Sequence, residues 1–244
     1  MSSGSTSAAK LGAVTTQYST QDIYQRVYAA ISERKLLPGT KLSEERLAAA
    51  FHVSRTRIRE VLFRLSQELI VELHPNRGAF ITSPTREDMQ QVFQVRRALE
   101  RGIVTDLCES VSAEAIQALQ RHLELEAQAR ERGDRAALAQ LTGEFHLRLA
   151  EATGNRLFAD NLRRLVALTG LIITQYGAAD SSACAGHEHT GIVRAIQEGR
   201  AEDAAQQMQA HLRHVEDSIK TPHEPGGEID FAQIFGLKGP APRG

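Results

Sequence analysis

The sequence predicts a mainly α-helical protein in two parts, an N-terminal winged helix-turn-helix with a small β wing and a C-terminal antiparallel all-α helical bundle. Residues 43–64 show two short helical patterns joined by a tight turn, the arrangement of a helix-turn-helix. Two short apolar runs around a His-Pro-Asn-Arg-Gly turn predict the wing. From residue 86 to about 220, apolar residues recur at helical spacing without strand-like alternation, which predicts the bundle.

The 244 residues suffice for two modest domains with separate cores. Residues 1–84 contain 11 of the 29 Lys and Arg and 7 of the 30 Asp and Glu, a net charge of +4, which leaves −5 for the remainder. A basic first domain followed by an acidic one favours a DNA reader joined to a domain that does not touch DNA. No segment reaches the length of a membrane span, and the N-terminus lacks an apolar signal core, so we expect a cytoplasmic protein without a membrane partner.

The N-terminal part begins with residues 1–19, which are small and polar and are expected to be disordered. Thr20 is the predicted N-cap of a first helix, which ends at a Leu-Pro-Gly turn. Ser43 caps the second helix and Ser54 caps the third, with a two-residue turn between these helices. The three helices precede the wing.

The wing is expected as strands at residues 69–73 and 79–82. Gly78 suits a turn position with positive φ, and Arg77 at the tip is placed to reach a minor groove or a phosphate. Residues 20–84 thus form one predicted domain, a winged helix-turn-helix.

The exposed face of the third helix opens with hydroxyl and guanidinium groups. Arginine can bond bidentately to guanine in the major groove, and the amides at a helix N-terminus can bind phosphate. We therefore expect double-stranded operator DNA as the partner, contacted through Ser54, Arg55, Thr56, Arg57 and Arg59. The alternative is a solvated basic helix face, but the preceding helix and the following hairpin favour DNA.

Residues 37–78 carry in order the patterns L-P-G-x-x-L-S-E-x-x-L-A, V-S-R-T-x-x-R-E-x-L and N-R-G. This stretch resembles the DNA-binding domain of the GntR family of bacterial transcription regulators. The resemblance implies base or phosphate contacts from Arg55, Thr56 and Arg59, and DNA backbone contacts from Ser54 and Gly78. Arg57 stands where many members have proline and would add a phosphate contact. Glu45 stands where the fatty-acid-responsive member has a DNA-contacting arginine, so that contact is not carried over.

The second part is expected to form six helices with glycines at most breaks, at 86–109, 112–132, 134–152, 155–176, 182–198 and 201–220. The fourth has an alternative reading as two shorter helices. Residues 85–221 form the predicted helical domain, and residues 222–244 form a Gly- and Pro-rich tail. Four apolar residues of the tail could dock on a surface, but we favour an unstructured tail: Ile229, Phe231, Ile234 and Phe235.

Three of these helices each place one histidine on or beside the apolar face, namely His146, His189 and His211. Arg96 lies on the apolar face of a fourth helix, and His187 faces outward. An imidazole buried without a partner loses the hydrogen bonds that it makes to water, and a shared divalent metal such as Zn²⁺ would satisfy all three rings. The alternative is three ordinary core histidines, because spacing in the sequence does not prove that the rings converge.

The helical part also matches the patterns of a known domain, R-x-x-L-E from Arg96, F-H-x-x-L-A-x-A-x-G-N from Phe145, E-H-x-x-I-x-x-A-I from Glu188 and M-x-x-H-L from Met208. It resembles the ligand-sensing FCD domain of the FadR subfamily of GntR regulators. Many members bind a metal through three histidines, which correspond to the three named above, and an Asp four residues before the first. Thr142 occupies the Asp position, so the resemblance leaves one coordination position to water, an anionic effector or another side chain. Arg96 would offer its fork of donors to the carboxylate of the effector.

These features predict a homodimeric transcription regulator rather than an enzyme. Its winged helix binds a palindromic operator, and a small acidic metabolite in the helical domain changes the affinity for DNA. One alternative keeps the DNA and makes the metal itself the signal. Another is a metal-dependent hydrolase, which is disfavoured because no carboxylate is expected beside the histidines as a general base. The nearest, Glu144, lies off the face of His146.

Overall fold

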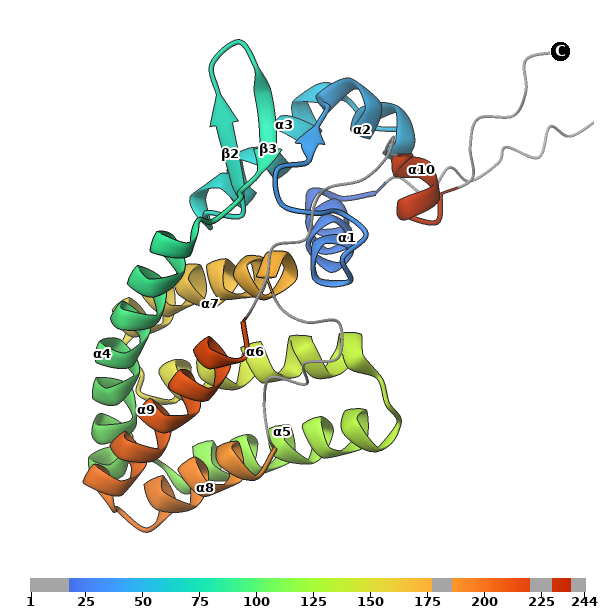
Figure 1. Cartoon of the computed structure of the whole chain (residues 1–244). Coiled ribbons are helices and arrows are strands. Elements are labelled where there is room, and N and C mark those ends of the chain that lie inside the picture. Colours follow the sequence, from blue (N-terminus) through green and yellow to red (C-terminus); the bar gives the residue numbers. More distant parts are fainter. Residues whose placement is uncertain (1–17, 177–185, 220–229, 238–244) are drawn as a thin grey trace, which may run out of the picture.

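The computed structural model describes residues 18–176, 186–219 and 230–237, and it shows two parts joined by a short extended segment (Figure 1). The first part is a small head of helices and strands, and the second is a set of long helices below it in this view. The mainly helical, two-part fold is the one that the sequence predicts. The N-terminal stretch expected to be disordered falls mostly on residues 1–17, outside the described residues.

The described residues of the head form three helices and three strands: α1 (Thr20–Ser32), β1 (Lys41–Leu42), α2 (Glu44–Phe51), α3 (Arg55–Gln67), β2 (Val71–His74) and β3 (Gly78–Ile81). The N-cap of α1 is Ser19 and not Thr20, because the Ser19 hydroxyl accepts from the amide of Asp22 while the Asp22 carboxylate accepts from the Ser19 amide. The sequence pattern misses β1, since two residues show no alternation. The predicted wing strands are each displaced by one or two residues.

Two serine caps and one left-handed residue set the angle between α2 and α3. The hydroxyl of Ser43 accepts from the amide of Arg46, and that of Ser54 accepts from the amide of Arg57. His52 ends α2 with a φ of 53°, so the chain turns sharply into α3. The apolar faces of the two helices are buried together, as their periodicity predicts: Leu47, Ala48, Phe51, Ile58, Val61, Leu62 and Leu65.

The wing is an antiparallel sheet in the order β1-β3-β2. Its register pairs Val71 with Ile81 and His74 with Gly78. Gly78 has a φ of 97°, the positive value that the turn pattern predicts. In Figure 1 the β2–β3 hairpin projects away from the long helices, which leaves its tip accessible.

The described residues of the second part form six long helices: α4 (Arg86–Ser110), α5 (Ala113–Glu131), α6 (Arg135–Ala152), α7 (Arg156–Tyr176), α8 (Gly186–Gln197) and α9 (Ala201–Asp217). Their bounds lie within a few residues of those predicted, although the first residues expected for α8 fall outside the described range. Because α7 is continuous, the alternative of two shorter helices is wrong. Among the described helices, none is long and apolar enough to cross a membrane.

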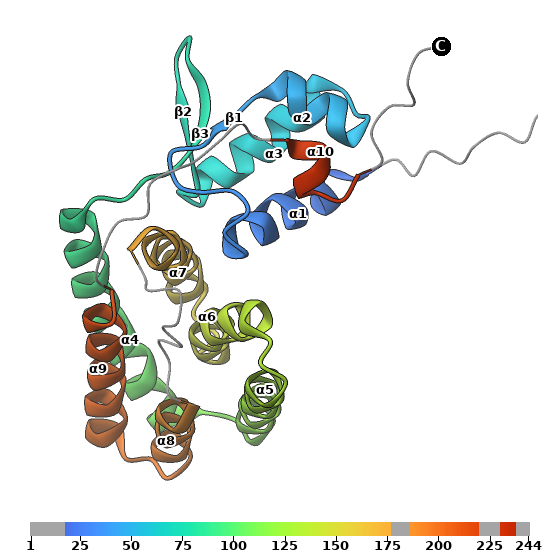
Figure 2. The ribbon, with the colours of Figure 1, turned by 45° about the vertical axis from the view of Figure 1, so that its right-hand side comes forward.

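The long helices share one core, with α4 packed along α9 and in contact with α6, α7 and α8 (Figure 2). The head rests on α7, which adds Ala167 and Leu171 to the core of the head. The Nη2 of Arg34, just after α1, donates to the backbone oxygen of Ile173 at 2.9 Å. This packing puts α7 in contact with the head, and Thr169 of α7 also accepts from Arg96, next to the site described below.

A short helix near the C-terminus, α10 (Phe231–Ile234), lies against the head beside α1 and α2 (Figures 1 and 2). The preference for an unstructured tail is wrong for residues 230–237, because the side chains of Phe231 and Phe235 are only 3% and 5% exposed. The other tail residues lie outside the described ranges.

Candidate functional site

The exposed face of α3 carries two arginines held by one carboxylate. The Nε of Arg59 donates to Oε2 of Glu44 at 2.8 Å, and Nη2 of Arg55 donates to the same oxygen at 3.3 Å. The arginine side chains are nonetheless 61% and 59% exposed. An exposed ion pair adds little stability, so the effect of Glu44 is to hold two guanidiniums side by side. Thr56 is exposed on the same first turn of α3.

Arg57 points to a different side of α3 from Arg55 and Arg59. Its Nη1 donates to the backbone oxygen of Tyr18 at 3.0 Å, which ties α3 to the residues just before α1. Its amide is the group that the Ser54 cap binds. The structure therefore gives Arg57 contacts within the head, where the sequence suggests a phosphate contact.

The tip of the wing presents Arg77 and Gly78, both exposed. The guanidinium of Arg77 lies 5.7 Å from the ring centroid of Phe80, within range of a cation–π contact. The positive φ of Gly78 would strain any residue with a side chain. The wing thus adds one cation and one unhindered backbone position at the end of the hairpin.

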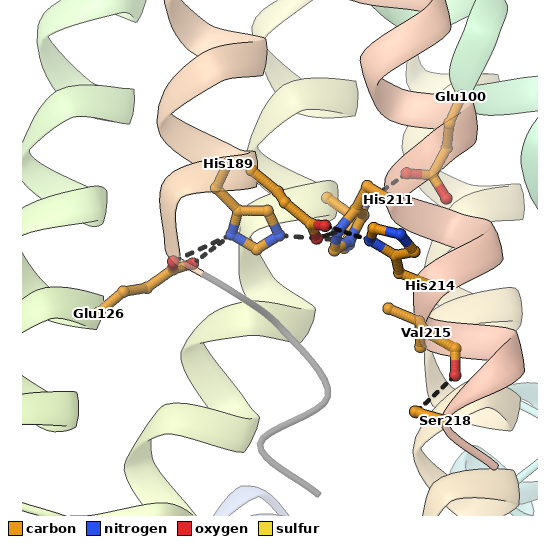
Figure 3. Close-up of polar contacts among 9 residues, drawn as sticks. Glu100, Glu126, His189, His211, His214, Val215 and Ser218 are labelled. Atoms are coloured by element: carbon orange, nitrogen blue, oxygen red, sulfur yellow. Dashed lines mark hydrogen bonds and ion pairs between the residues drawn. The ribbon is translucent and has the colours of Figure 1, made fainter.

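Three histidines from three helices meet in the core of the second part. His146 comes from α6, His189 from α8 and His211 from α9, and their exposed fractions are 5%, 0% and 1%. The Nε2 atom of His211 lies 3.4 Å from that of His189 and 3.4 Å from that of His146. One ring nitrogen of each lies within 4.8 Å of the others. Figure 3 shows the rings of His189 and His211 directed at each other.

Each of the three rings is also bonded to a glutamate through Nδ1. His146 pairs with Glu100 of α4, His189 with Glu126 of α5 at 2.9 and 3.0 Å, and His211 with Glu188 of α8 at 2.8 Å. The expectation that no carboxylate lies beside the histidines is therefore wrong. It fails because each glutamate belongs to a different helix from its histidine, 23 to 63 residues away. These three carboxylates bond to Nδ1 of the rings and not to the facing Nε2 atoms, so they orient the rings instead of serving as a base there.

Burial and charge keep the carboxylates ionised and the rings of His146 and His211 neutral. Burial alone would raise the pKa of Glu100, but Arg96 and the imidazole of His146 outweigh it and hold this pKa at about 2. Hydrogen bonds from two histidines hold the pKa of Glu126 at about 2 against the same effect of burial. Desolvation lowers the pKa of His146 to about 4 and that of His211 to about 3. An ionised carboxylate only accepts, so in the rings of His146 and His211 the proton is on Nδ1 and a lone pair on Nε2 faces the other rings.

The geometry and charge of this histidine centre fit a divalent metal. Zn–N bonds of about 2.0–2.1 Å in a tetrahedron place ligand nitrogens about 3.3–3.4 Å apart, and two of the separations here are 3.4 Å. The three carboxylates bonded to the rings outnumber the one arginine that pairs with them, so the charge around the centre favours a cation. A carboxylate on the second nitrogen is also the usual outer partner of a metal-bound histidine.

Arg96 and Thr142, the residues expected to bind an effector, lie close to this centre in the fold or along the helix. Arg96 is 3% exposed; its Nε donates to Glu100 at 2.7 Å and its Nη1 to the hydroxyl of Thr169 at 3.1 Å. Its Nη2 has no hydrogen-bond partner among the described residues. Because Glu100 also bonds His146, one carboxylate separates Arg96 from the centre. Thr142 lies one helical turn before His146, and its hydroxyl donates to a carbonyl of its own helix at 3.1 Å.

The histidine centre includes residues that sequence reasoning misses. His122 of α5 is 2% exposed, its Nε2 donates to the backbone oxygen of Leu141 at 2.9 Å, and it lies 3.5 Å from Glu126. A signal does exist for two of the three glutamates. Glu126 follows His122, and Glu100 follows Arg96, by four residues, so each pair lies on one side of a helix that is otherwise apolar.

Two family models match this chain. Residues 19–81 match the model described as bacterial regulatory proteins, gntR family, and residues 91–214 match the FCD domain. The HTH-type transcriptional repressor RspR of Escherichia coli (strain K12) is 22% identical over 206 residues, which cover 84% of this chain and 90% of RspR. The HTH-type transcriptional regulator LutR of Bacillus subtilis (strain 168) is 29% identical over 215 residues, covering 78% of this chain and 95% of LutR.

Solved structures show the same fold. A GntR transcriptional regulator from Rhodococcus sp. RHA1 superimposes with a TM-score of 0.70 at 24% identity, covering 81% of this chain and 95% of the other. E. coli McbR/YncC gives a TM-score of 0.67 at 18% identity, covering 80% and 93%. At these identities the likeness concerns the fold alone.

Proposed function

The chain belongs to the GntR family of bacterial regulatory proteins and carries an FCD domain, and from this premise we propose that a divalent metal and a small acidic metabolite together set its affinity for operator DNA. The family and the relatives make it a DNA-binding transcription regulator and not an enzyme. The head reads the operator, and the FCD domain holds the metal and the metabolite.

The DNA contacts come from the first turns of α3 and from the wing. Three exposed residues read base edges in the major groove: Arg55, Thr56 and Arg59. The carboxylate of Glu44 supports this role because it holds two guanidiniums adjacent, ready to donate to O6 and N7 of guanine. Ser54 and the amides at the start of α3 face a phosphate, and Arg77 and Gly78 of the wing contact the DNA backbone or the minor groove.

The metal proposal rests on one observation, that three carboxylate-bonded imidazoles converge, with Nε2 of His211 3.4 Å from Nε2 of His146 and 3.4 Å from Nε2 of His189. Lone pairs that face one another repel. A cation bound between them would accept all three lone pairs and remove the repulsion. Three imidazoles in this arrangement suit Zn²⁺. The hydroxyl of Thr142 is a poor ligand, so His146, His189 and His211 leave at least one coordination position for a further group.

A small carboxylate is the effector that this centre suits. A bound metal would supply a Lewis-acidic position for one carboxylate oxygen. Nη2 of Arg96, buried and one carboxylate away from His146, is the donor available to the other oxygen. A recess of about 530 Å³ beside Glu126, lined also by Leu123 and His187, offers a small anion an approach to the same region.

The helix α4 connects this centre to the head. Glu100 of α4 holds the ring of His146, and α4 packs along α9, which carries His211. At its other end α4 begins only five residues after β3 ends at Ile81. We propose that a ligand which shifts α6, α8 and α9 moves the head through α4, so that the two arrangements of the head differ in operator affinity.

The chain acts as a homodimer, which matches the two-fold symmetry of a palindromic operator. An apolar recess of about 390 Å³ between the wing and the long helices supports this assembly. Leu69 and Val95 line it and are 45% and 50% exposed, beside the partly buried Leu165 and Leu168. Burial of such a surface by a second copy removes apolar area from water.

The decisive experiment measures metal content. The purified chain should contain about one divalent ion, and its removal by a chelator should lower the melting temperature. Substituting Ala for any one of His146, His189 and His211 should reduce the bound metal, whereas His187→Ala, an exposed change on the same helix as His189, should not. Thr142→Asp should tighten metal binding because it adds an anionic ligand one turn before His146. Metal-free protein of unchanged stability that still responds to a carboxylate would show that the histidines are instead polar contacts of an effector pocket.

A second experiment separates metabolite from metal as the signal. Operator affinity is measured while Zn²⁺ is added to stripped protein, and then while a panel of small carboxylates is added to metal-loaded protein. We expect the carboxylate titration to change the affinity and the metal titration alone to leave it unchanged. The reverse result would establish a metal-responsive regulator.

A further inference from the structure

The helix α10 is part of the DNA-reading head, although it comes from the other end of the chain. The ring centroid of Phe235 lies 4.8 Å from that of Phe51 in α2, and the guanidinium of Arg46 lies 5.2 Å from the centroid of Phe231. Nη1 of Arg26 in α1 donates to the backbone oxygen of Phe235 at 3.1 Å. Both aromatic side chains belong to the buried core of the head. Two helices of the head therefore bind this segment by aromatic, cation–π and backbone contacts.

The order of α10 comes from this docking. A helix shorter than about 12–15 residues is marginal in water, and α10 has four residues. Its own contribution is the cap of Asp230, whose carboxylate accepts from the amides of Ala232 and Gln233. Burial of two phenylalanines, each with roughly 150–250 Å² of surface, supplies the stabilisation that so short a helix lacks on its own.

The docking seat is the set of residues that bind α10, namely Arg26, Arg46 and Phe51, and it lies at the turn of the helix-turn-helix. Phe51, on which Phe235 packs, is the last residue of α2, and the left-handed His52 follows directly. Tyr18 meets the other side of this region, with its ring 5.5 Å from that of Phe51 and its backbone oxygen bonded to Arg57 of α3. The helix α10 thus completes the packing around the turn between α2 and α3. The exposed arginine pair of α3 stays uncovered.

The chain passes between the head and the FCD domain twice, and the second passage leads to α10. The chain leaves the bundle after α9, which carries His211, and ten residues, 220–229, separate Ile219 from Asp230 at the seat. The first passage is the segment between β3 and α4.

We propose that residues 230–237 act as a clamp on the head: the seat of Arg26, Arg46 and Phe51 takes this aromatic C-terminal segment, and its occupancy keeps the turn between α2 and α3 in the geometry that reads DNA. The occupant is the chain's own segment. Since the docked segment leaves the arginine pair exposed, docking supports operator binding and does not block it. The DNA half of this inference rests on the operator-binding role of the head.

The test uses the full-length double variant Phe231→Ala/Phe235→Ala, with Gln233→Ala as a matched control on the exposed side of the same helix. Hydrogen exchange should speed up by about tenfold or more in α2 and the turn after it, while amides of α4 to α9 keep their protection. Affinity for a duplex that the unmodified protein selects from a random-sequence library should fall by a similar factor. The control should match the unmodified protein in both measurements.

A milder variant and a peptide rescue distinguish loss of the docked segment from general unfolding of the double variant. Arg46→Ala removes the cation–π contact but keeps both phenylalanines, so it should show a smaller change of the same kind. A synthetic peptide of residues 228–238, added to the double variant, should restore protection and affinity, and the same peptide with both phenylalanines changed to alanine should not. Unchanged exchange in the double variant would overturn the clamp, and faster exchange with unchanged DNA affinity would overturn its role in reading. If the unmodified protein selects no duplex, the operator-binding role itself fails, while the exchange experiment still decides whether the segment docks.

Discussion

Each histidine of the centre is bonded to a glutamate, and yet burial keeps the rings of His146 and His211 neutral. The pKa of His146 is lowered from 6.5 to about 4, and that of His211 to about 3, chiefly because a charged imidazole would be desolvated there. The neighbouring rings add to this effect for His211. Protons therefore compete poorly with a metal for these nitrogens at neutral pH, and they become competitors only in acid.

The stability of the metal-stripped protein should accordingly fall as the pH is lowered from about 6.5 toward about 4. In this window the unfolded chain has protonated histidines while folded His146 and His211 stay neutral, so the unfolded state binds more protons and gains relative to the folded state. Below about pH 4.5, Glu100 further lowers the stability of the folded state, because its pKa is about 2 in the folded protein and the unfolded chain therefore binds its proton first. Calorimetry across this range would measure the effect, with His187→Gln as an exposed control. A melting temperature that does not change between about pH 6.5 and 4.5 would contradict the burial of neutral rings.

The sequence pattern alone predicts some residues of the site, depending on where each residue lies on its helix. His146, His189 and His211 are visible because each interrupts or borders an apolar face at helical spacing. Glu188, the partner of His211, stands next to His189 on α8, and only the fold shows that it bonds a ring of another helix. The turn of Arg57 toward Tyr18 is equally invisible, since it depends on where the residues before α1 run.

Among the elements, α3 combines an ordinary buried face with an exposed face whose two arginines are oriented by α2. Arg55→Ala and Arg59→Ala should each weaken operator binding by about 1–3 kcal/mol, the usual loss of one base contact. Both side chains are exposed, so the melting temperature should hardly change. Fluorescence anisotropy on a selected duplex would measure this, with Arg194→Ala of α8, 75% exposed, as the control for loss of a positive charge. Retention of full affinity by both variants would remove α3 from the reading surface.

The elements that the sequence predicts well are those with local signals. Serine caps, glycine breaks and 3.6-residue periodicity locate α2 to α7 within a few residues, because all these signals lie inside or next to each helix. In contrast, β1 has two residues and is defined by pairing with β3, and α10 is ordered by contact with Phe51, 184 positions earlier. Local propensity does not predict these two elements, because their partners are distant in the sequence.

At the scale of the whole molecule, the homodimer proposed above would present two heads to the two half-sites of an operator. The purified chain should therefore have a mass of about 54 kDa by light scattering, twice the 26.8 kDa of one chain. Val95→Asp, in the apolar recess near the head, should shift this mass toward the monomer, because it places a charge where a second copy would bury apolar surface. Leu157→Asp, at a 72% exposed position at the start of α7, is the matched control. A mass of one chain, both free and on operator DNA, would rule out the dimer.

The position of α10 also sets an order of events during synthesis. The head is made first, but Phe235, which packs on its Phe51, is made 184 residues later. At about 5–20 residues per second, the ribosome needs roughly 10–40 s to cover that distance. Throughout this interval the newly made head lacks its last core residues and presents an apolar seat to chaperones. A regulator built in this way completes its reading head only after its entire helical domain has been made.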